Sequence, residues 1–206
     1  MTDIVQGTQE WFEARLGRVT ASRIADVMMK PTTAGYSNYR AQLVCERLTG
    51  QPTETFTSAA MRHGTDTEPQ ARAFYEMETG LDVTEVGFVP HPKLEMSGAS
   101  PDGLIGSDGG LEIKCPQPAT HIKTLTGANI DRKYMLQMQW GMACTGCEWW
   151  DFVSFCPSLP DEMQMHRERV KRDAEQIEEI TCAVTSFLAD VDALMADLSR
   201  KYREAA

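Results

Sequence analysis

The chain has 206 residues, of which 42% are apolar and 24% charged, and this composition predicts a single folded domain, residues 1–206, with a sizeable core. No stretch approaches the roughly 18 consecutive apolar residues of a membrane-spanning helix, and the first 17 residues lack the layout of a secretion signal. We therefore expect a soluble, cytoplasmic protein without a membrane partner. The net charge of −10 argues against a broad basic surface for nucleic acid.

Acidic residues are concentrated in residues 61–112, which hold 3 basic and 10 acidic groups. Such a segment is typical of a site for a hard cation, although a solvated helix face gives the same count. The six cysteines, without a secretion signal, predict reduced thiols. Cys144 and Cys147 form the one tight pair, which is compatible with half of a metal site or with a helix end closed by Gly146. The lack of a second such pair favours the helix end.

Helical patterns dominate the first 80 residues. The expected helices span residues 8–15, 21–29, 39–48 and 58–79. Thr20 or Ser22 is expected to cap the second helix, and Gly50 to end the third. Pro69 should break or kink the fourth helix, which Gly80 ends.

The pattern changes to short β-branched or alternating stretches after Gly80. The expected strands span residues 83–89, 95–99, 111–115, 149–155 and 164–170, and two further helices span residues 131–145 and 173–198. The first three strands are predicted to form a meander with a hairpin loop at 107–110. This order predicts an α/β fold with a mixed central sheet flanked by helices.

The predicted meander gathers residues that suit phosphodiester hydrolysis. Asp102 ends one strand, while Glu112 and Lys114 project from one face of the next and Ile113 faces the core. Two carboxylates can hold a divalent cation, and an adjacent ammonium can orient or deprotonate a water molecule. The alternative is a polar hairpin face without chemistry. Glu68 supports the first interpretation because it falls among apolar positions on its helix, where a buried carboxylate needs compensation; its alternative is an exposed residue at a helix start.

These residues belong to five motifs that resemble, in content and order, those of phage alkaline exonucleases of the lambda exonuclease or YqaJ type, within the PD-(D/E)xK nuclease superfamily. The motifs are WFEARLG at 11–17 with TAS at 20–22, GTDTEPQAR at 64–72, SPDG at 100–103, LEIKCP at 111–116, and YMLQMQ at 134–139. The resemblance covers residues 7–156, about three quarters of the chain.

The resemblance implies a restriction-endonuclease-like PD-(D/E)xK core and a metal-dependent 5′→3′ exonuclease. Such an enzyme degrades one strand of linear double-stranded DNA to mononucleotides and leaves 3′ single-stranded tails for recombination by strand annealing. The implied cofactor is Mg²⁺, as two ions that Mn²⁺ can replace. The side chains of Asp102 and Glu112 and the carbonyl of Ile113 would bind the ions, with Glu68 in the same acidic site and Lys114 assisting the attacking water.

A pocket for the 5′ phosphate of the degraded strand is also implied by the resemblance. The positions that match it are Arg15, Ser22, Ser100 and Gln137. A guanidinium with hydroxyls at helix and strand ends makes a plausible anion site. The alternatives are an ion pair of Arg15 with Glu10 or Glu13, and a buried Gln137 amide with a structural partner.

The family's members work with a single-strand annealing protein and assemble as closed trimeric rings. The implied partners are therefore double-stranded DNA ends, an annealing protein and two further copies of the chain. A homotrimer ring would let a protein of charge −10 retain DNA by enclosing it, with only a local basic lining.

Two other functions remain open at this point. One is a PD-(D/E)xK endonuclease of the restriction or junction-resolving type, which would lack the phosphate pocket around Arg15. The other is a non-degrading relative that only binds DNA ends. That relative would not need Asp102, Glu112 and Lys114 together.

Overall fold

The main sheet is a mixed one with five strands in the order β2-β5-β6-β7-β8. The computed structural model describes residues 5–53 and 59–203. The strands are β2 (Val83–Thr84), β5 (Gly103–Ile105), β6 (Gly109–Lys114), β7 (Trp149–Phe155) and β8 (Met165–Lys171). β6 and β7 are parallel, and the other neighbours are antiparallel. The predicted mixed central sheet is therefore confirmed.

A second sheet has three strands in the order β1-β4-β3. They are β1 (Val19–Thr20), β4 (Ser97–Ala99) and β3 (Val89–Pro90). The predicted meander is wrong in this respect, because residues 83–89 supply one strand to each sheet and cross between them. Alternating apolar residues indicate a buried strand face but not which strand lies beside it.

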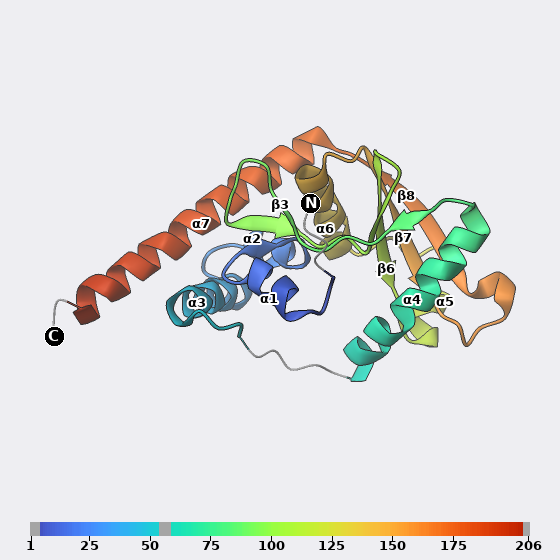
Figure 1. Cartoon of the computed structure of the whole chain (residues 1–206), viewed down its shortest axis with the longest axis horizontal. Coiled ribbons are helices and arrows are strands. Elements are labelled where there is room, and N and C mark those ends of the chain that lie inside the picture. Colours follow the sequence, from blue (N-terminus) through green and yellow to red (C-terminus); the bar gives the residue numbers. More distant parts are fainter. Residues whose placement is uncertain (1–4, 54–58, 204–206) are drawn as a thin grey trace.

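Seven α-helices and two short 3-10 helices accompany the sheets in the described residues. They are α1 (Gln9–Arg15), η1 (Ala21–Arg23), α2 (Ile24–Val27), α3 (Ala34–Thr49), α4 (Ala59–Thr79), α5 (Pro118–Leu125), α6 (Arg132–Thr145), η2 (Asp161–Met163) and α7 (Ala174–Arg203). None is long and apolar enough to cross a membrane. In Figure 1, α7 runs along one side of the molecule, away from α4 and α5.

The structure corrects three of the helix predictions and confirms two of the predicted helix ends. The second predicted helix begins as the 3-10 helix η1, and neither Thr20 nor Ser22 caps it with its side chain. Pro69 does not break the fourth predicted helix, because α4 continues through it, and the predicted start at residue 58 lies outside the described residues. Helix α5 was not predicted, although Pro118 at its first turn is a usual start signal. Gly50 and Gly146 end α3 and α6 in the left-handed conformation, so the helix-end interpretation of the Cys144 and Cys147 pair is confirmed.

Helices α4 and α6 cover opposite faces of the main sheet. Ala71 and Tyr75 of α4 pack with Leu111 and Ile113 of β6. Residues of α6 pack with Trp150 and neighbours on the other face. A residue on β6 therefore faces α4 or α6 according to its position in the strand, and Glu112 faces α6.

Trp150 lies between α6 and β6 because glycines stand on both sides of its ring. A Cβ added at Gly110 of β6, or at Gly141 of α6, would come within 3.0 Å of the indole. Trp150 is 1% exposed and packs with Met138 and Met142 of α6. The two glycines thus allow a large ring to fill the space between helix and sheet.

A buried polar cluster ties α4 to β7 and β8 on the face of the sheet that α4 covers. Asp151 of β7 is 1% exposed, and it accepts a hydrogen bond from the Tyr75 hydroxyl (2.7 Å) and two from Arg169 (2.7 and 2.9 Å). Since a buried carboxylate needs charged partners, this cluster compensates Asp151 and fixes α4 on the sheet.

Candidate active site

The β5–β6 hairpin places Asp102 beside the C-terminal end of β6. Gly103 pairs with Leu111, and the Asp102 N–H donates to the Leu111 carbonyl (3.2 Å). The Asp102 Oδ2 atom accepts from the Ile113 N–H at 2.6 Å. The side chain is therefore fixed next to Glu112 and Lys114, as the hairpin prediction required.

Glu112 and Lys114 lie on the same face of β6 and contact each other. The Lys114 Nζ is 2.5 Å from Glu112 Oε1, and the Gln137 amide donates to the same oxygen at 2.7 Å. Glu112 is 2% exposed, whereas the Lys114 side chain is 30% exposed. Lys114 also lies over the Tyr134 ring, 5.0 Å from its centre. The ammonium therefore reaches solvent while the carboxylate beneath it does not.

Glu68 joins the cluster from α4 and is held by Arg72. The Arg72 Nη2 is 2.9 Å from Glu68 Oε1, and its Nη1 is 2.8 Å from Glu85 Oε1. The Arg72 Nε donates to the Asp102 carbonyl at 3.2 Å. One guanidinium thus connects α4, the segment after β2 and the turn that carries Asp102.

Burial raises the pKa values of the three carboxyl groups. It raises the pKa of Glu68 to about 7, with repulsion from Asp102 adding to the effect and Arg72 opposing it. It raises that of Glu112 to about 7 against the attraction of Lys114, and that of Asp102 as well. Burial alone would lower the pKa of Lys114, but Glu112 and Asp102 raise it. Lys114 is therefore a cation at neutral pH in this structure, but its single charge does not compensate the burial of all three carboxyl groups.

The donor set fits an oxygen-liganded divalent cation. Carboxylate oxygens are the ligands that Mg²⁺ and Mn²⁺ prefer, and a cation would relieve the burial cost of three acids. Within the described residues, however, no three His, Cys, Asp or Glu side chains converge as a complete ligand set. Glu112 and Asp102 each have an oxygen hydrogen-bonded by the protein.

A hollow of about 420 Å³ lies between α1, η1 and α3. Its polar lining includes Arg15, Arg18, Arg23, Thr20, Ser22 and the buried Glu46. Three guanidinium groups and two hydroxyls outnumber the one carboxylate, which favours an anion as the occupant.

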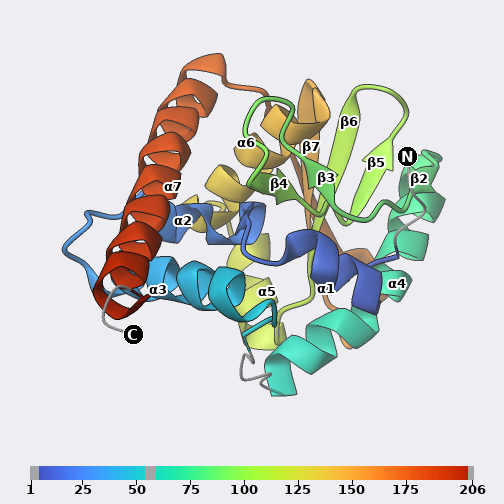
Figure 2. The ribbon, with the colours of Figure 1, turned by 60° about the vertical axis from the view of Figure 1, so that its left-hand side comes forward.

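Arg15 connects the hollow to Ser100, which lies two residues before Asp102. Its Nη1 donates to the Ser100 hydroxyl at 2.8 Å, and its guanidinium lies over the Trp11 ring, 4.0 Å from the centre. The Trp11 indole N–H also donates to Ser100, at 3.0 Å. Burial lowers the pKa of Arg15 to about 10. Among the described residues Arg15 forms no ion pair, so the alternative pairing with an acid of α1 is not what the structure shows. Figure 2 shows α1 below β3 and β4, and Ser100 directly follows the end of β4.

The structure distributes the predicted phosphate residues over two places. Arg15 and Ser22 line the hollow and Ser100 bonds to Arg15, whereas Gln137 bonds to Glu112 at the carboxylate cluster. Sequence reasoning missed Arg72 and gave Trp11 no role at the site. Both had a detectable signal, because each stands four residues from a predicted site residue on the same helix, Arg72 from Glu68 and Trp11 from Arg15.

Residues 10–148 match the model of the YqaJ-like viral recombinase domain, which is more than half of the chain. The chain belongs to this family. The matched segment of the YqaJ-like domain contains all of the predicted site residues. No curated protein matches the chain significantly.

Three solved structures that are similar to this YqaJ-like chain are structures of exonucleases. The alkaline exonuclease LHK-Exo from Laribacter hongkongensis is 50% identical, with a TM-score of 0.91 over 97% of this chain and 100% of that chain. A structure of LHK-Exo in complex with dAMP is 51% identical, with the same TM-score and coverage. A phage-related exonuclease from Haemophilus somnus 129PT shares the fold at 15% identity, with a TM-score of 0.73 over 88% of this chain and 96% of that chain. The predicted PD-(D/E)xK fold class is confirmed by these neighbours.

Proposed function

We propose that this chain is a metal-dependent 5′→3′ exonuclease that degrades one strand of linear double-stranded DNA to mononucleotides and leaves 3′ tails for strand annealing. The observation that carries the proposal is the cluster of Asp102, Glu112, Lys114 and Glu68, together with a hollow lined by Arg15, whose guanidinium donates to Ser100 near Asp102. The complex of LHK-Exo with dAMP supports it, because a deoxynucleoside monophosphate is the product of such an enzyme.

The metal site would be formed by Asp102, Glu112, the Ile113 carbonyl and Glu68. Bound Mg²⁺, in two ions that Mn²⁺ can replace, would supply charge neutralisation at the scissile phosphate and an acidified water. Gln137 and Lys114 hold Glu112 in place for this role, and Arg72 holds Glu68. Lys114 would assist the attacking water by orienting it and by neutralising developing negative charge.

The 5′ phosphate would enter the hollow. Arg15 presents its guanidinium there, and Ser22 supplies a hydroxyl. Ser100 bonds to Arg15 and lies two residues before Asp102, so the bound phosphate and the carboxylates are linked by a short, fixed segment. This arrangement favours cleavage at a set distance from a 5′ end over cleavage within a strand.

The partners of this function would be a single-strand annealing protein and two further copies of the chain in a ring. The net charge of −10 supports the ring, because an acidic protein retains DNA better by enclosing it than by surface attraction. Light scattering at working concentration should give the mass of a trimer, and a monomer would contradict this part of the proposal.

The function is tested on a linear duplex labelled at one 5′ end, with Mg²⁺ or with EDTA. We expect release of the 5′ mononucleotide with Mg²⁺ only. Lys114→Ala, Asp102→Asn and Glu112→Gln should each lower the rate at least ~100-fold while end binding persists. Lys133→Ala is the matched control, because Lys133 also lies over the Tyr134 ring but is exposed and pairs with Asp131.

The other functions give different results in the same assay. With a duplex labelled at one 3′ end instead, early loss of that label would indicate the opposite polarity, and cutting of a closed circular duplex would indicate an endonuclease. Binding of ends without cleavage in any divalent metal would indicate a non-degrading module. Wild-type rate in Lys114→Ala would refute the assignment of the site.

A further inference from the structure

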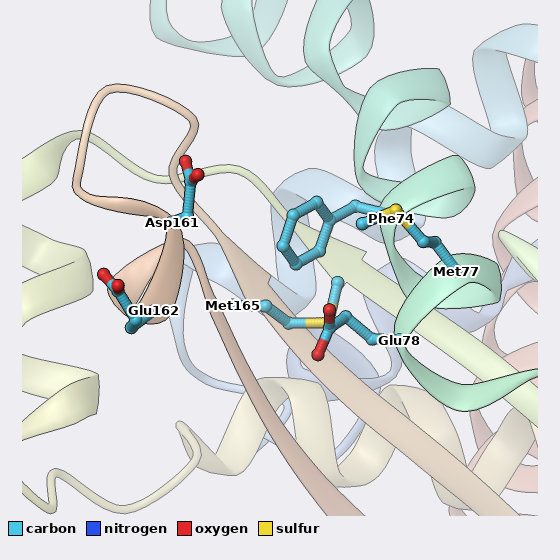
Figure 3. A pocket seen from close by; sticks show the side chains of 6 residues that line it. All are labelled: Phe74, Met77, Glu78, Asp161, Glu162 and Met165. Atoms are coloured by element: carbon cyan, nitrogen blue, oxygen red, sulfur yellow. The ribbon is translucent and has the colours of Figure 1, made fainter.

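A second hollow, of about 510 Å³, lies between the C-terminal half of α4 and the segment from η2 to β8. Figure 3 shows its six lining residues, with Asp161 and Glu162 on the η2 side and the others on α4 and β8. They are Phe74, Met77, Glu78, Asp161, Glu162 and Met165. We call this region the methionine groove. It contains none of the residues assigned to the candidate active site.

The methionine groove has an apolar floor that no other part of the described chain covers fully. Met77 is 69% exposed, and Met163 of the adjacent η2 helix is 52% exposed. Unbranched methionine side chains adapt their shape to an apolar partner, so they are common at surfaces that bind peptides. Met77 is the exposed apolar lining residue, whereas Phe74 and Met165 are half-buried and pack against the core, so the apolar surface open to a partner is centred on Met77.

The rim of the methionine groove is negatively charged without compensation. Glu78, Asp161 and Glu162 contribute three carboxylates, and no cationic side chain is among the six lining residues. In the part of the chain that the structure describes, none of these three carboxylates takes part in an ion pair. The occupant that complements this rim is positively charged.

The η2 wall of the groove is held in place by buried contacts. His121 is fully buried, and its Nε2 lies 2.9 Å from the Met163 carbonyl, to which it donates. The Gln164 amide donates to Asp161 Oδ1 and to the Leu159 carbonyl, both at 3.0 Å. A surface fixed in this way loses little conformational entropy on binding.

Two kinds of occupant conflict with these observations. DNA would be repelled by the rim carboxylates. A metal ion needs converging ligands, and the described residues contain no group of three His, Cys, Asp or Glu side chains that could hold one. An apolar floor with an acidic rim instead matches an amphipathic peptide that carries both apolar side chains and Lys or Arg.

We propose that the methionine groove docks a cationic amphipathic segment of a partner protein. Its apolar side chains would cover Met77, Phe74 and Met165, and its Lys or Arg side chains would pair with the rim carboxylates. Glu78 follows Glu68 by ten residues on α4, about 15 Å along the helix, so a docked segment leaves the candidate active site open. The docking requires nothing of the proposed nuclease activity and is tested separately.

The probe is a fluorescently labelled synthetic 16-residue helical peptide with Leu and Lys at amphipathic spacing. Its binding to the full chain is measured by fluorescence anisotropy. A twin peptide with Glu in place of Lys reports the charge requirement. We expect the Glu twin to bind at least about tenfold more weakly than the Lys peptide. Glu78→Lys with Glu162→Lys should weaken binding of the Lys peptide by a similar factor.

Matched controls separate the groove from the overall negative charge. Glu178→Lys with Glu179→Lys makes the same charge change on the exposed side of α7, and should alter binding less than about threefold. Met77→Ser should weaken binding severalfold, whereas Leu48→Ser, at another exposed apolar residue on α3 (49% against 69% for Met77), should not. Circular dichroism and cleavage rate should match the native protein in all variants.

Equal weakening by the α7 and groove variants would overturn the proposal, since binding would then follow net charge alone. Equal binding of the two peptides would overturn it as well. If Glu78→Lys with Glu162→Lys changed the mass measured by light scattering, the groove would be a contact between copies of this chain instead.

Discussion

Replacing Glu112 with glutamine should stabilise the metal-free protein while it abolishes cleavage. Burial raises the pKa of Glu112 to about 7, so folding favours its neutral form. Glutamine has the shape of protonated glutamate and cannot ionise. The variant therefore avoids a cost that the native chain bears whenever this carboxyl is charged.

The size and sign of the effect follow from the pKa in the two states. Because the folded-state pKa is about 7 and the ordinary value is 4.5, stability from this group is complete below pH 4.5 and is lost as pH rises through 7. When the carboxyl is ionised in both states, at pH 8.5, the loss is roughly 3 kcal/mol. At pH 5.5 it is roughly 1 kcal/mol, because only the unfolded state is then largely ionised.

Urea unfolding in EDTA at pH 5.5 and 8.5 measures this difference. The free energy of unfolding of Glu112→Gln should exceed that of the native protein by about 3 kcal/mol at pH 8.5 and by about 1 kcal/mol at pH 5.5. Glu178→Gln on the exposed side of α7 is the control and should change stability by less than about 0.5 kcal/mol at both pH values. Added Mg²⁺ should stabilise the native protein and have little effect on Glu112→Gln.

An equal or smaller gain at pH 8.5 than at pH 5.5 would refute the reasoning, because the advantage of glutamine must grow as the native carboxyl ionises. A loss of stability at pH 8.5 would mean that the ion pair with Lys114 outweighs the burial of Glu112.

Three further predictions concern residues around the cluster. The native enzyme should cleave a 5′-phosphate duplex about 10- to 100-fold faster than a 5′-hydroxyl duplex, because of charge-assisted hydrogen bonds to the phosphate. Arg15→Ala should remove this preference without slowing cleavage of the 5′-hydroxyl duplex. Equal native rates on the two duplexes would contradict the prediction. Arg72→Lys keeps the charge but cannot contact Glu68, Glu85 and the Asp102 carbonyl at once. The cleavage rate at saturating Mg²⁺ should therefore fall about tenfold with little change in KM for DNA. An unchanged rate would show that Glu68 needs no positioning by Arg72. Tyr75→Phe should lower unfolding free energy by about 1.5–3 kcal/mol through loss of its bond to Asp151, and leave the cleavage rate unchanged; a loss below 0.5 kcal/mol would show that water replaces the hydroxyl.

Local chemistry made much of the fold predictable from the sequence. Gly50 and Gly146 end helices because each adopts a left-handed conformation that other residues avoid. β7 is a run of consecutive buried residues, and α7 has a clear amphipathic helical pattern, so both were recognisable from the sequence. The partition of residues 83–89 between two sheets was not predictable, because strand neighbours are set by tertiary packing rather than by local pattern.

The candidate site was predictable where its residues are close in the chain or share a motif. Asp102, Glu112 and Lys114 needed only a hairpin and strand alternation. The contact of Gln137 with Glu112 was not predictable, since it depends on how closely α6 approaches the sheet. A sequence gives the position of a residue along a helix but not the distance from that helix to a strand.

The ring of Trp150 acts as a spacer that sets this distance. Gly141 follows Gln137 by four residues on α6, and Gly110 precedes Glu112 by two on β6, so the hydrogen bond between Gln137 and Glu112 lies one step from the indole contact on each element. The thickness of the indole ring, packed between the backbones at Gly110 and Gly141, therefore helps to set the 2.7 Å distance between the Gln137 amide and the Glu112 carboxylate. The geometry of the acidic cluster thus depends in part on how Trp150 packs between α6 and β6.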